Sequence, residues 1–301
     1  MSHIKKRKGI ILAGGTGKRL SPLTNATSKQ LLPIYDKPMI YYPLTTLMMA
    51  GVKEILLICN AEYKFLFHNL LGDGNKWGLN IEYICQPKPE GIAQAFILGE
   101  SFLDNSSCVL ILGDNLFYGN ELTNQLKAAN EKSEGATLFA YPVSDPSRYG
   151  IIGLDNFKKV TSIEEKPKNP KSNLAITGIY FFDNKVVNYA KELIPSKRGE
   201  LEITDINKRY LLQNKLNIQF LGRGMAWFDT GTFDALQDAG NFIRTLEKRQ
   251  GLKVGCPEEV AWRNGFIEDK DLKKLALGHA QSNYGNYLLE LLVNNERDIY
   301  N

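Results

Sequence analysis

The stretch that decides the fold reads Lys8-Gly-Ile-Ile-Leu-Ala-Gly-Gly-Thr-Gly-Lys-Arg-Leu20. Its first part, residues 9–13, is a short run of Ile, Leu and Ala, which is typical of a buried strand. The run ends at three glycines, Gly14, Gly15 and Gly17, which predict a loop. Because glycine lacks a Cβ, such a loop can turn backbone N–H groups toward an anion, and Lys18 and Arg19 add positive charge. We therefore predict a loop that holds a nucleoside triphosphate.

Two common phosphate-binding loops do not fit this spacing. A dinucleotide fingerprint G-x-G-x-x-G that begins at Gly15 would need glycine where Leu20 stands. A Walker loop that ends at Gly17 and Lys18 would need Ser or Thr in place of Arg19. The glycines alone also fit a simple tight turn between a strand and a helix, and this alternative stays open. The positive charges that follow them favour the phosphate interpretation.

Further motifs follow along the chain. They are Ser28-Lys-Gln-Leu-Leu-Pro-Ile-Tyr-Asp-Lys-Pro38, Leu112-Gly-Asp-Asn115, Ser147-Arg-Tyr-Gly150, Glu164-Glu-Lys-Pro167, Arg198-Gly-Glu-Leu-Glu-Ile-Thr-Asp205 and Trp227-Phe-Asp-Thr-Gly-Thr232. With these motifs the sequence resembles the bacterial glucose-1-phosphate thymidylyltransferases, which make dTDP-glucose, over nearly its whole length. The glycine loop alone indicates a sugar nucleotidylyltransferase, whereas the motif from Lys29 to Pro38 is specific to the thymidylyl branch. Lys18 departs from the family, which more often has a small hydroxyl residue there; its side chain either contacts the triphosphate or points to solvent.

Composition indicates an ordinary globular protein. With 301 residues, 43% of them hydrophobic, the chain can bury a large core in one domain or two. The net charge of +4 is matched by the four cations of Lys5-Lys-Arg-Lys8, so the basic balance is local and does not indicate a nucleic-acid partner. No apolar run approaches the roughly 18 residues that span a bilayer, and the polar start lacks the apolar segment of a signal peptide. We predict a cytoplasmic protein that does not bind membranes.

Cysteine and histidine usage gives no metal or disulfide pattern. The four cysteines lack C-x-x-C spacing, and Cys59, Cys85 and Cys108 lie in or beside strand-like segments. We interpret them as reduced core thiols. The three histidines are scattered along the chain and do not support a zinc site.

The first half of the chain alternates strands and helices. Strands are predicted at 9–13, 54–59, 80–85, 107–112 and 136–141, and helices at 41–50, 63–70, 92–98 and 122–130. Apolar strands separated by helices imply right-handed crossovers and a mostly parallel sheet with both faces covered. We predict an α/β fold, a Rossmann-like three-layer sandwich. In such a fold the ligand lies beyond the carboxyl ends of the strands, where the glycine loop and Asp114 fall.

The resemblance divides the chain into a nucleotidylyltransferase domain, 1–250, and a helical tail, 251–301. The nucleotide-binding part of the domain is expected at about 1–115, and an inserted β-rich part for the sugar phosphate at about 116–235. In the tail, helices are predicted at 258–264, 269–278 and 281–292. The family uses this region for a regulatory nucleotide site and for a homotetramer, which implies a dTDP-sugar as feedback inhibitor. A tail that simply packs on its own domain is the open alternative.

Asp114 follows the apolar run 109–112, and Asp229 ends a second apolar stretch. A carboxylate at a strand's carboxyl end beside phosphate is a natural ligand of Mg²⁺. Asp114 also fits a cap on the next turn through Asn115. In the resembled family these two aspartates hold the magnesium ion, and both positions match.

The resemblance also assigns the substrate contacts. Leu12, Gly14, Gly15, Gly17, Gln30 and Asp114 are expected at the nucleotide, where Gln86 and the backbone of Gly91 read the base, although Gln86 also fits a strand cap. The sugar phosphate is expected at Tyr149, Gly150, Glu165, Lys166, Ile176, Arg198 and Thr204. Without the family match, Glu164 to Lys166 would read as a solvated charge cluster.

The predicted chemistry is attack of the phosphate of glucose 1-phosphate on the α-phosphorus of dTTP, in line with the departing pyrophosphate. The nucleophile is already an anion, so charge neutralisation is what the site must supply, by Mg²⁺ and by Arg19, Lys29 and Lys166. A sibling enzyme that uses UTP or another sugar phosphate, and a sugar-nucleotide sensor without chemistry, are the alternatives.

Overall fold

Strand β1 (Lys8–Ala13) lies inside the central sheet of the computed structural model, which describes residues 6–294. Within these residues, nine strands form one sheet, and its main path runs β10-β9-β11-β6-β1-β4-β5. β1 pairs in parallel with β4 (Glu54–Cys59) and β6 (Cys108–Leu112), and β4 pairs in parallel with β5 (Asn80–Cys85). These strands confirm the first four that the sequence predicts. Lys5 of the basic run and residues 295–301 of the predicted tail lie outside the described residues.

The remaining strands extend this sheet on the other side of β6. β11 (Leu174–Phe182) is antiparallel to β6 and to β8 (Ala136–Pro142), so β8 runs in the same direction as β6. β12 (Leu216–Phe220) adds in parallel to β8, and the hairpin of β9 (Gly150–Leu154) and β10 (Val160–Glu165) joins β11 at Ala175. The mostly parallel sheet is confirmed, because among its described strands only β10 and β11 run opposite to the others.

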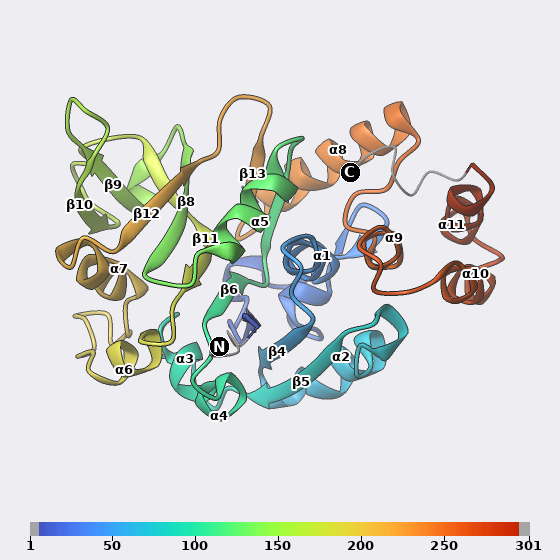
Figure 1. The fold of residues 1–301 in the computed structure, drawn as a ribbon, viewed down its shortest axis with the longest axis horizontal. Helices are drawn as coiled ribbons and strands as arrows, with labels where there is room; N and C mark the ends of the chain where they lie inside the picture. Colours follow the sequence, from blue (N-terminus) through green and yellow to red (C-terminus); the bar gives the residue numbers. More distant parts are fainter. Residues whose placement is uncertain (1–5, 295–301) are drawn as a thin grey trace, which may run out of the picture.

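Helices cover both faces of the sheet, which confirms the predicted α/β sandwich (Figure 1). One face carries α1 (Tyr41–Met49), α2 (Lys64–Leu71) and α5 (Leu122–Glu131). On this side α9 (Pro257–Arg263) packs on α1, and α10 (Asp269–Gly278) and α11 (Asn283–Val293) lie beyond α9 and join the same apolar cluster. The other face carries α3 (Gln94–Leu98), α4 (Glu100–Leu103), α6 (Val186–Lys191) and α7 (Ile203–Leu212). Along β1, Ile11 packs on the first face and Ile10 on the second, as the alternation of side chains in a strand requires.

Two small antiparallel pairs and one long helix complete the frame. β7 (Asn115–Tyr118) pairs with β13 (Ala226–Asp229), and β2 (Pro33–Ile34) pairs with β3 (Lys37–Pro38). Helix α8 (Phe233–Gln250) packs against both of them in a third apolar cluster. The predicted helix 92–98 begins only at Gln94, because the preceding turn packs against the backbone of Leu201.

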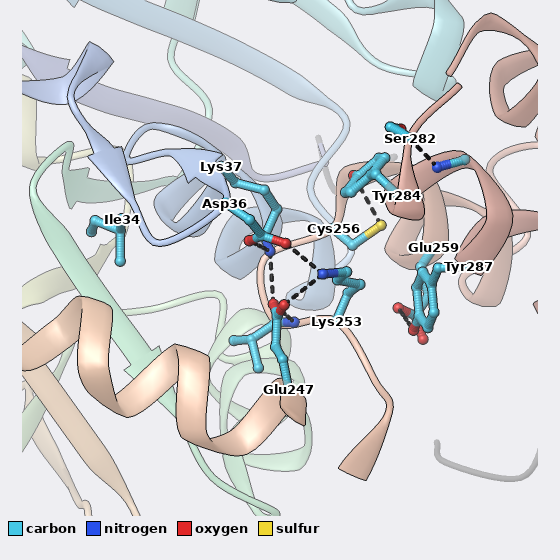
Figure 2. Close-up of polar contacts among 12 residues, drawn as sticks. Ile34, Asp36, Lys37, Glu247, Lys253, Cys256, Glu259, Ser282, Tyr284 and Tyr287 are labelled. Carbon is cyan, nitrogen blue, oxygen red and sulfur yellow. Dashed lines mark hydrogen bonds and ion pairs between the residues drawn. The ribbon is translucent and has the colours of Figure 1, made fainter. Parts of the chain in front are cut away.

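The three predicted helices of the tail are confirmed, and α9 packs directly on α1. A cluster of four charges fastens the start of the tail (Figure 2). Buried Lys37 contacts Asp36 and donates to Glu247 Oε1 at 2.7 Å, while Lys253 Nζ donates to Glu247 Oε2 at 2.7 Å and also to Asp36. We call these four residues the hinge cluster, because they join the β2–β3 turn, the end of α8 and the first residues of the tail.

Two further expectations concern the cysteine thiols and the membrane. Cys59 and Cys108 are buried free thiols on β4 and β6, Cys85 is a partly buried free thiol on β5, and Cys256 is buried before α9. Burial raises the pKa of Cys59 to about 11 and that of Cys108 to about 12, which keeps both thiols protonated at neutral pH. Among residues 6–294, no helix has the length and apolar character needed to cross a membrane.

Candidate active site

The glycine loop leaves β1 at the carboxyl edge of the sheet and opens into a cavity of about 420 Å³. Of its three glycines, Gly17 has the positive φ, 63°, that starts the short 3₁₀ turn Lys18–Leu20. Gly14 is needed for another reason, because a Cβ there would lie 1.8 Å from Gln86 Oε1. We call this space the loop cavity. Of the predicted residues, its lining includes Leu12, Gly15, Gly17, Lys18, Arg19, Lys29, Gln30 and Asp114.

A second cavity, of about 230 Å³, lies beside the first between β11, β13 and α7. We call it the strand cavity. It brings together all the residues that the sequence assigns to the sugar phosphate, together with the second aspartate: Tyr149, Gly150, Glu165, Lys166, Ile176, Arg198, Thr204 and Asp229. Arg19 and Asp114 line both cavities, so the two spaces meet at these side chains.

The meeting point concentrates charge in a largely buried place. Lys29 Nζ contacts Asp114, and the contacts with Lys29 outweigh burial and lower the pKa of Asp114. Burial and the neighbouring charge of Asp114 raise the pKa of Asp229. Arg19 lies near Asp229, since a Cβ at Gly231 would lie 3.0 Å from Arg19 Nη2 and 3.1 Å from Asp229 Oδ1. The charge of Asp114 thus disfavours ionisation of Asp229, and a further cation near both carboxylates would favour it.

The cations of the strand cavity differ in how firmly they are held. Arg198 Nη2 donates to Glu202 at 2.7 and 2.8 Å and to Glu165 Oε1 at 3.2 Å. Lys166 Nζ lies 3.8 Å from Glu165 Oε1, its side chain is 48% exposed, and its backbone φ is 42°. A left-handed φ on a residue with a side chain is a strained conformation of the kind that gathers at functional sites. Lys166 is therefore the more available cation, and Arg198 is part of an ion-paired network.

Glu165 is fixed from two sides. Besides the contact with Arg198, it accepts a hydrogen bond from Thr204 Oγ1 at 2.5 Å. Thr204 is on α7 and Glu165 ends β10, so this contact closes one wall of the strand cavity.

Three predicted residues line neither cavity. Gln86 is buried, donates to Gln94 Oε1 at 2.6 Å and lies beneath Gly14. Gly91 has φ 104°, and a Cβ there would lie 2.4 Å from the carbonyl oxygen of Leu201, so close packing with the 199–203 segment requires glycine. The roles of Gly14, Gln86 and Gly91 at the base stay predictions.

The strand cavity also contains residues that the sequence analysis did not place at the site. Among them are Arg148, Tyr180, Gly178, Trp227, Asn207, Asn115 and Glu200, the last of which also lines the loop cavity. The sequence could have indicated Trp227, because it lies two residues before Asp229 on one strand and therefore on the same face. Asn207 is buried, and neither of its amide atoms has a hydrogen-bond partner among residues 6–294. No spacing in the sequence points to it.

Residues 8–245 match the family model described as nucleotidyl transferase. The chain belongs to this family. It is therefore a nucleotidyltransferase, and the glycine loop, both aspartates and both cavities lie in the matched segment.

Two relatives that this nucleotidyltransferase resembles carry the same name. It is 53% identical to a glucose-1-phosphate thymidylyltransferase of Neisseria meningitidis over 95% of this chain and 99% of that protein. It is 55% identical to one of Mycobacterium tuberculosis over 96% of this chain and 100% of that protein. These matches confirm the resemblance on which the sequence analysis relied.

Two solved structures are also similar to this chain. A crystal structure described as a glucose-1-phosphate thymidylyltransferase from Bacillus anthracis, in complex with sucrose, has a TM-score of 0.73 and 44% identity, and the match covers 79% of this chain and 95% of that one. UDP-glucose pyrophosphorylase with UDP-glucose has a TM-score of 0.71 over 80% of this chain and 99% of that one, at 22% identity, and shows the same fold.

Proposed function

We propose that this nucleotidyltransferase transfers the thymidylyl group of dTTP to glucose 1-phosphate and releases pyrophosphate, giving dTDP-glucose, the first step toward dTDP-sugars such as dTDP-rhamnose. The observation that carries the proposal is the pair of adjoining cavities that meet at Arg19 and Asp114. One space has the glycine loop suited to a triphosphate, and the other has the fixed carboxylate and hydroxyl groups suited to a sugar. The names of the full-length relatives support the choice of both substrates.

In this proposal the loop cavity takes dTTP. Arg19 and Lys29 neutralise the triphosphate, while the glycine loop, Leu12 and Gln30 surround it, and Gln86 and Gly91 contribute to recognition of the base. The strand cavity takes glucose 1-phosphate, with Lys166 on its phosphate. Glu165, Tyr149, Gly150, Ile176, Thr204 and Arg198 form the surroundings of the sugar.

We also propose that Asp114 and Asp229 hold Mg²⁺. The fit rests on Asp229, whose pKa is raised by burial and by the neighbouring charge of Asp114; a divalent cation held by both carboxylates would offset this repulsion. Mg²⁺ commonly takes one or two protein carboxylates together with phosphate oxygens and water, and Asp114 lines the loop cavity proposed for the triphosphate. When bound, Mg²⁺ neutralises charge on the reacting phosphates.

The chain's own contribution is then position and charge. The attacking phosphate oxygen needs no general base, since it is already an anion. Lys166 at one end and Arg19 at the other hold the attacking phosphate and the α-phosphate in line, and fixed cations in a site shielded from water stabilise the charge that develops.

The test is pyrophosphate release with glucose 1-phosphate and Mg²⁺, with dTTP, UTP, CTP, GTP and ATP offered separately. A strong preference for dTTP is expected. A preference for UTP would keep the mechanism and replace the substrate, whereas no release with any nucleotide would contradict the proposal and favour a sensor. Chelation of the metal should abolish release and be reversed by added Mg²⁺.

We further propose that the tail carries the regulatory site. A cavity of about 230 Å³ lies between α1, α5, β7 and the start of the tail, and Tyr118, Gly119, Lys253, Glu259 and Arg263 are among its lining residues. Lys253 belongs both to this cavity and to the hinge cluster (Figure 2), so an anionic dTDP-sugar here would compete with Asp36 and Glu247 for its ammonium group. Inhibition by a dTDP-sugar that persists at saturating dTTP is expected, and purely competitive inhibition would contradict it.

The resemblance to the family also suggests the oligomeric state and the location of the protein. We propose a homotetramer in the cytoplasm. Sedimentation of the full chain at several concentrations tests the first statement, and a single monomeric species would contradict it.

A further inference from the structure

Asn115 lies where the chain turns from β6 into β7, directly after Asp114, and only 2% of it is exposed. Its side-chain amide makes three hydrogen bonds. Oδ1 accepts from Trp227 Nε1 at 2.6 Å and from the backbone N–H of Gly178 at 3.1 Å. Nδ2 donates to Asp114 Oδ1 at 3.0 Å. The two lone pairs of the oxygen and one N–H of the amide are therefore in use.

These bonds join three strands that are distant in sequence. Asn115 is on β7, opposite Asp229 in the register of the β7–β13 pair, and Trp227 is on β13. Gly178 is on β11 at the point where the register of that strand shifts, between Ile176 and Tyr180. A Cβ at Gly178 would lie 2.3 Å from Asn115 Oδ1, so the amide takes the place of a side chain there. The lack of a side chain at Gly178 therefore leaves room for the Asn115 amide at this irregular point of β11.

The three partners of Asn115 all line the strand cavity. Trp227 adjoins the residues proposed for the sugar, since the ring of Tyr149 packs against it with 5.1 Å between centroids. Asp114 also lines the loop cavity proposed for dTTP, and Lys29 contacts it there. One amide therefore bonds both to a neighbour of the proposed sugar site and to a residue of the proposed phosphate site.

We propose that Asn115 is a positioning residue, which fixes the Trp227 indole and the Asp114 carboxylate relative to each other and so keeps the sugar and the reacting phosphates in register. This inference rests on the proposed function of the two cavities. No other side chain of similar size fills the role. A carboxylate accepts from Trp227 and Gly178 but cannot donate to Asp114, and an aliphatic side chain leaves two buried N–H groups without partners.

Asn115→Asp separates the contacts with Trp227 and Gly178 from the contact with Asp114: it keeps the shape and both accepted hydrogen bonds, but it replaces the donation to Asp114 with a second carboxylate that repels it. We expect kcat to fall about tenfold or more, since misplacement near the reacting atoms is costly. Affinity for dTDP-glucose, measured by calorimetry in EDTA, should stay within about threefold of wild type, because the sugar wall is kept. Wild-type kcat in this variant would overturn the proposal.

A double-mutant cycle tests the contact between Asn115 and Trp227 by ligand binding, with no measurement of turnover. Asn115→Ala and Trp227→Phe are each expected to weaken dTDP-glucose binding in EDTA, by about fivefold or more for Asn115→Ala, and the double variant should bind no more weakly than Asn115→Ala. Additive losses would show that the two side chains act independently and would overturn the proposal.

A control addresses general loosening of the site. Tyr141→Phe removes a hydrogen bond to the carbonyl oxygen of Met225, on the far side of Trp227, and leaves every contact of Asn115 in place. It should bind dTDP-glucose as wild type does; a loss as large as that of Asn115→Ala would point to packing alone. A wild type that neither binds dTDP-glucose nor releases pyrophosphate would contradict the proposed function, whereas an active wild type with additive variants contradicts only the role of Asn115.

Discussion

Single side chains at the junction of the two cavities bear most of the proposed chemistry. Arg19 lines both cavities, and Lys166 is a cation of the strand cavity that is more accessible than the ion-paired Arg198. Neither belongs to the buried apolar core, so each can be removed without leaving a hole in the packing.

Arg19→Ala and Lys166→Ala are each expected to reduce kcat by roughly 10² or more, because a fixed cation on a reacting phosphate is worth several kcal/mol. Thermal unfolding should change little. Lys168→Ala is the matched control, since Lys168 is exposed two residues beyond Lys166 and lines neither cavity. Near wild-type turnover in both variants would contradict the assignment.

Gly14 and Gly15 provide a second test at this scale. Gly14→Ala places a methyl group against Gln86 Oε1 and must displace that side chain, whereas Gly15→Ala adds the same group where nothing lies within 4 Å. If Gln86 reads the base, Gly14→Ala should raise KM for dTTP about tenfold and relax the preference over UTP. Gly15→Ala should have a smaller effect on both. Equal effects would indicate that the loop responds to any added methyl group.

Among the secondary structure elements, α8 connects two functional regions. It begins directly after Thr232, three residues beyond Asp229, and spans about 27 Å to the hinge cluster. At that end Glu247 accepts from Lys37, Lys253 and the backbone N–H of Val254. The β2–β3 pair, which follows Lys29 and Gln30, is thus fastened to the same helix that follows the second aspartate.

The hinge cluster should make stability depend on pH. Burial alone would raise the pKa of Asp36, but its contacts with Lys37 and Lys253 outweigh burial and lower it. The contribution of Asp36 is therefore present above its unfolded-state pKa of about 3.9 and is lost as pH falls through the lower folded-state value.

Asp36→Asn should reduce the free energy of unfolding by about 1 kcal/mol at neutral pH, with a difference from wild type that shrinks below about pH 4. Denaturant titrations of both proteins between pH 3 and 7 measure this. A difference that grows toward low pH would have the wrong sign for a lowered pKa.

For the whole molecule, the tail is part of the main core rather than an appendage. Ala261 and Trp262 of α9 are buried in the same cluster as Leu44 and Leu47 of α1, and Trp77 Nε1 donates to Glu258 at 3.0 Å. The tail therefore packs on its own domain, and its use for a regulatory site and for the tetramer stays a prediction.

A chain that ends at residue 250 should consequently fail to fold, because it exposes this apolar surface to water. A chain that ends at residue 294 keeps α9 to α11 and should unfold like the full protein. Circular dichroism and sedimentation distinguish the two outcomes. A folded, active chain of 250 residues would show that the tail serves regulation alone.

The sequence predicted the strands from the clean apolar runs of β1, β4, β5, β6 and β8, and the tail helices from their spacing. The two aspartates and the cations could be assigned to the site from sequence because each is next to such a run or within a recognisable motif. Asn115 and Asn207 could not, since their importance comes from contacts across strands and from burial. Nor did it reveal that Arg198 is held by carboxylates, because three of its partners are charged residues that read equally well as solvated.

The sheet order also governs when this enzyme becomes complete during its synthesis. β1, β4, β5 and β6 can pair with one another as soon as residue 112 has left the ribosome, whereas β11, the second neighbour of β6, is made later. Asp229 reaches its place opposite Asn115 only when β13, the last strand along the described chain, has been made. A chain interrupted between these points would contain the glycine loop and Asp114 without the second aspartate, and so should release no pyrophosphate.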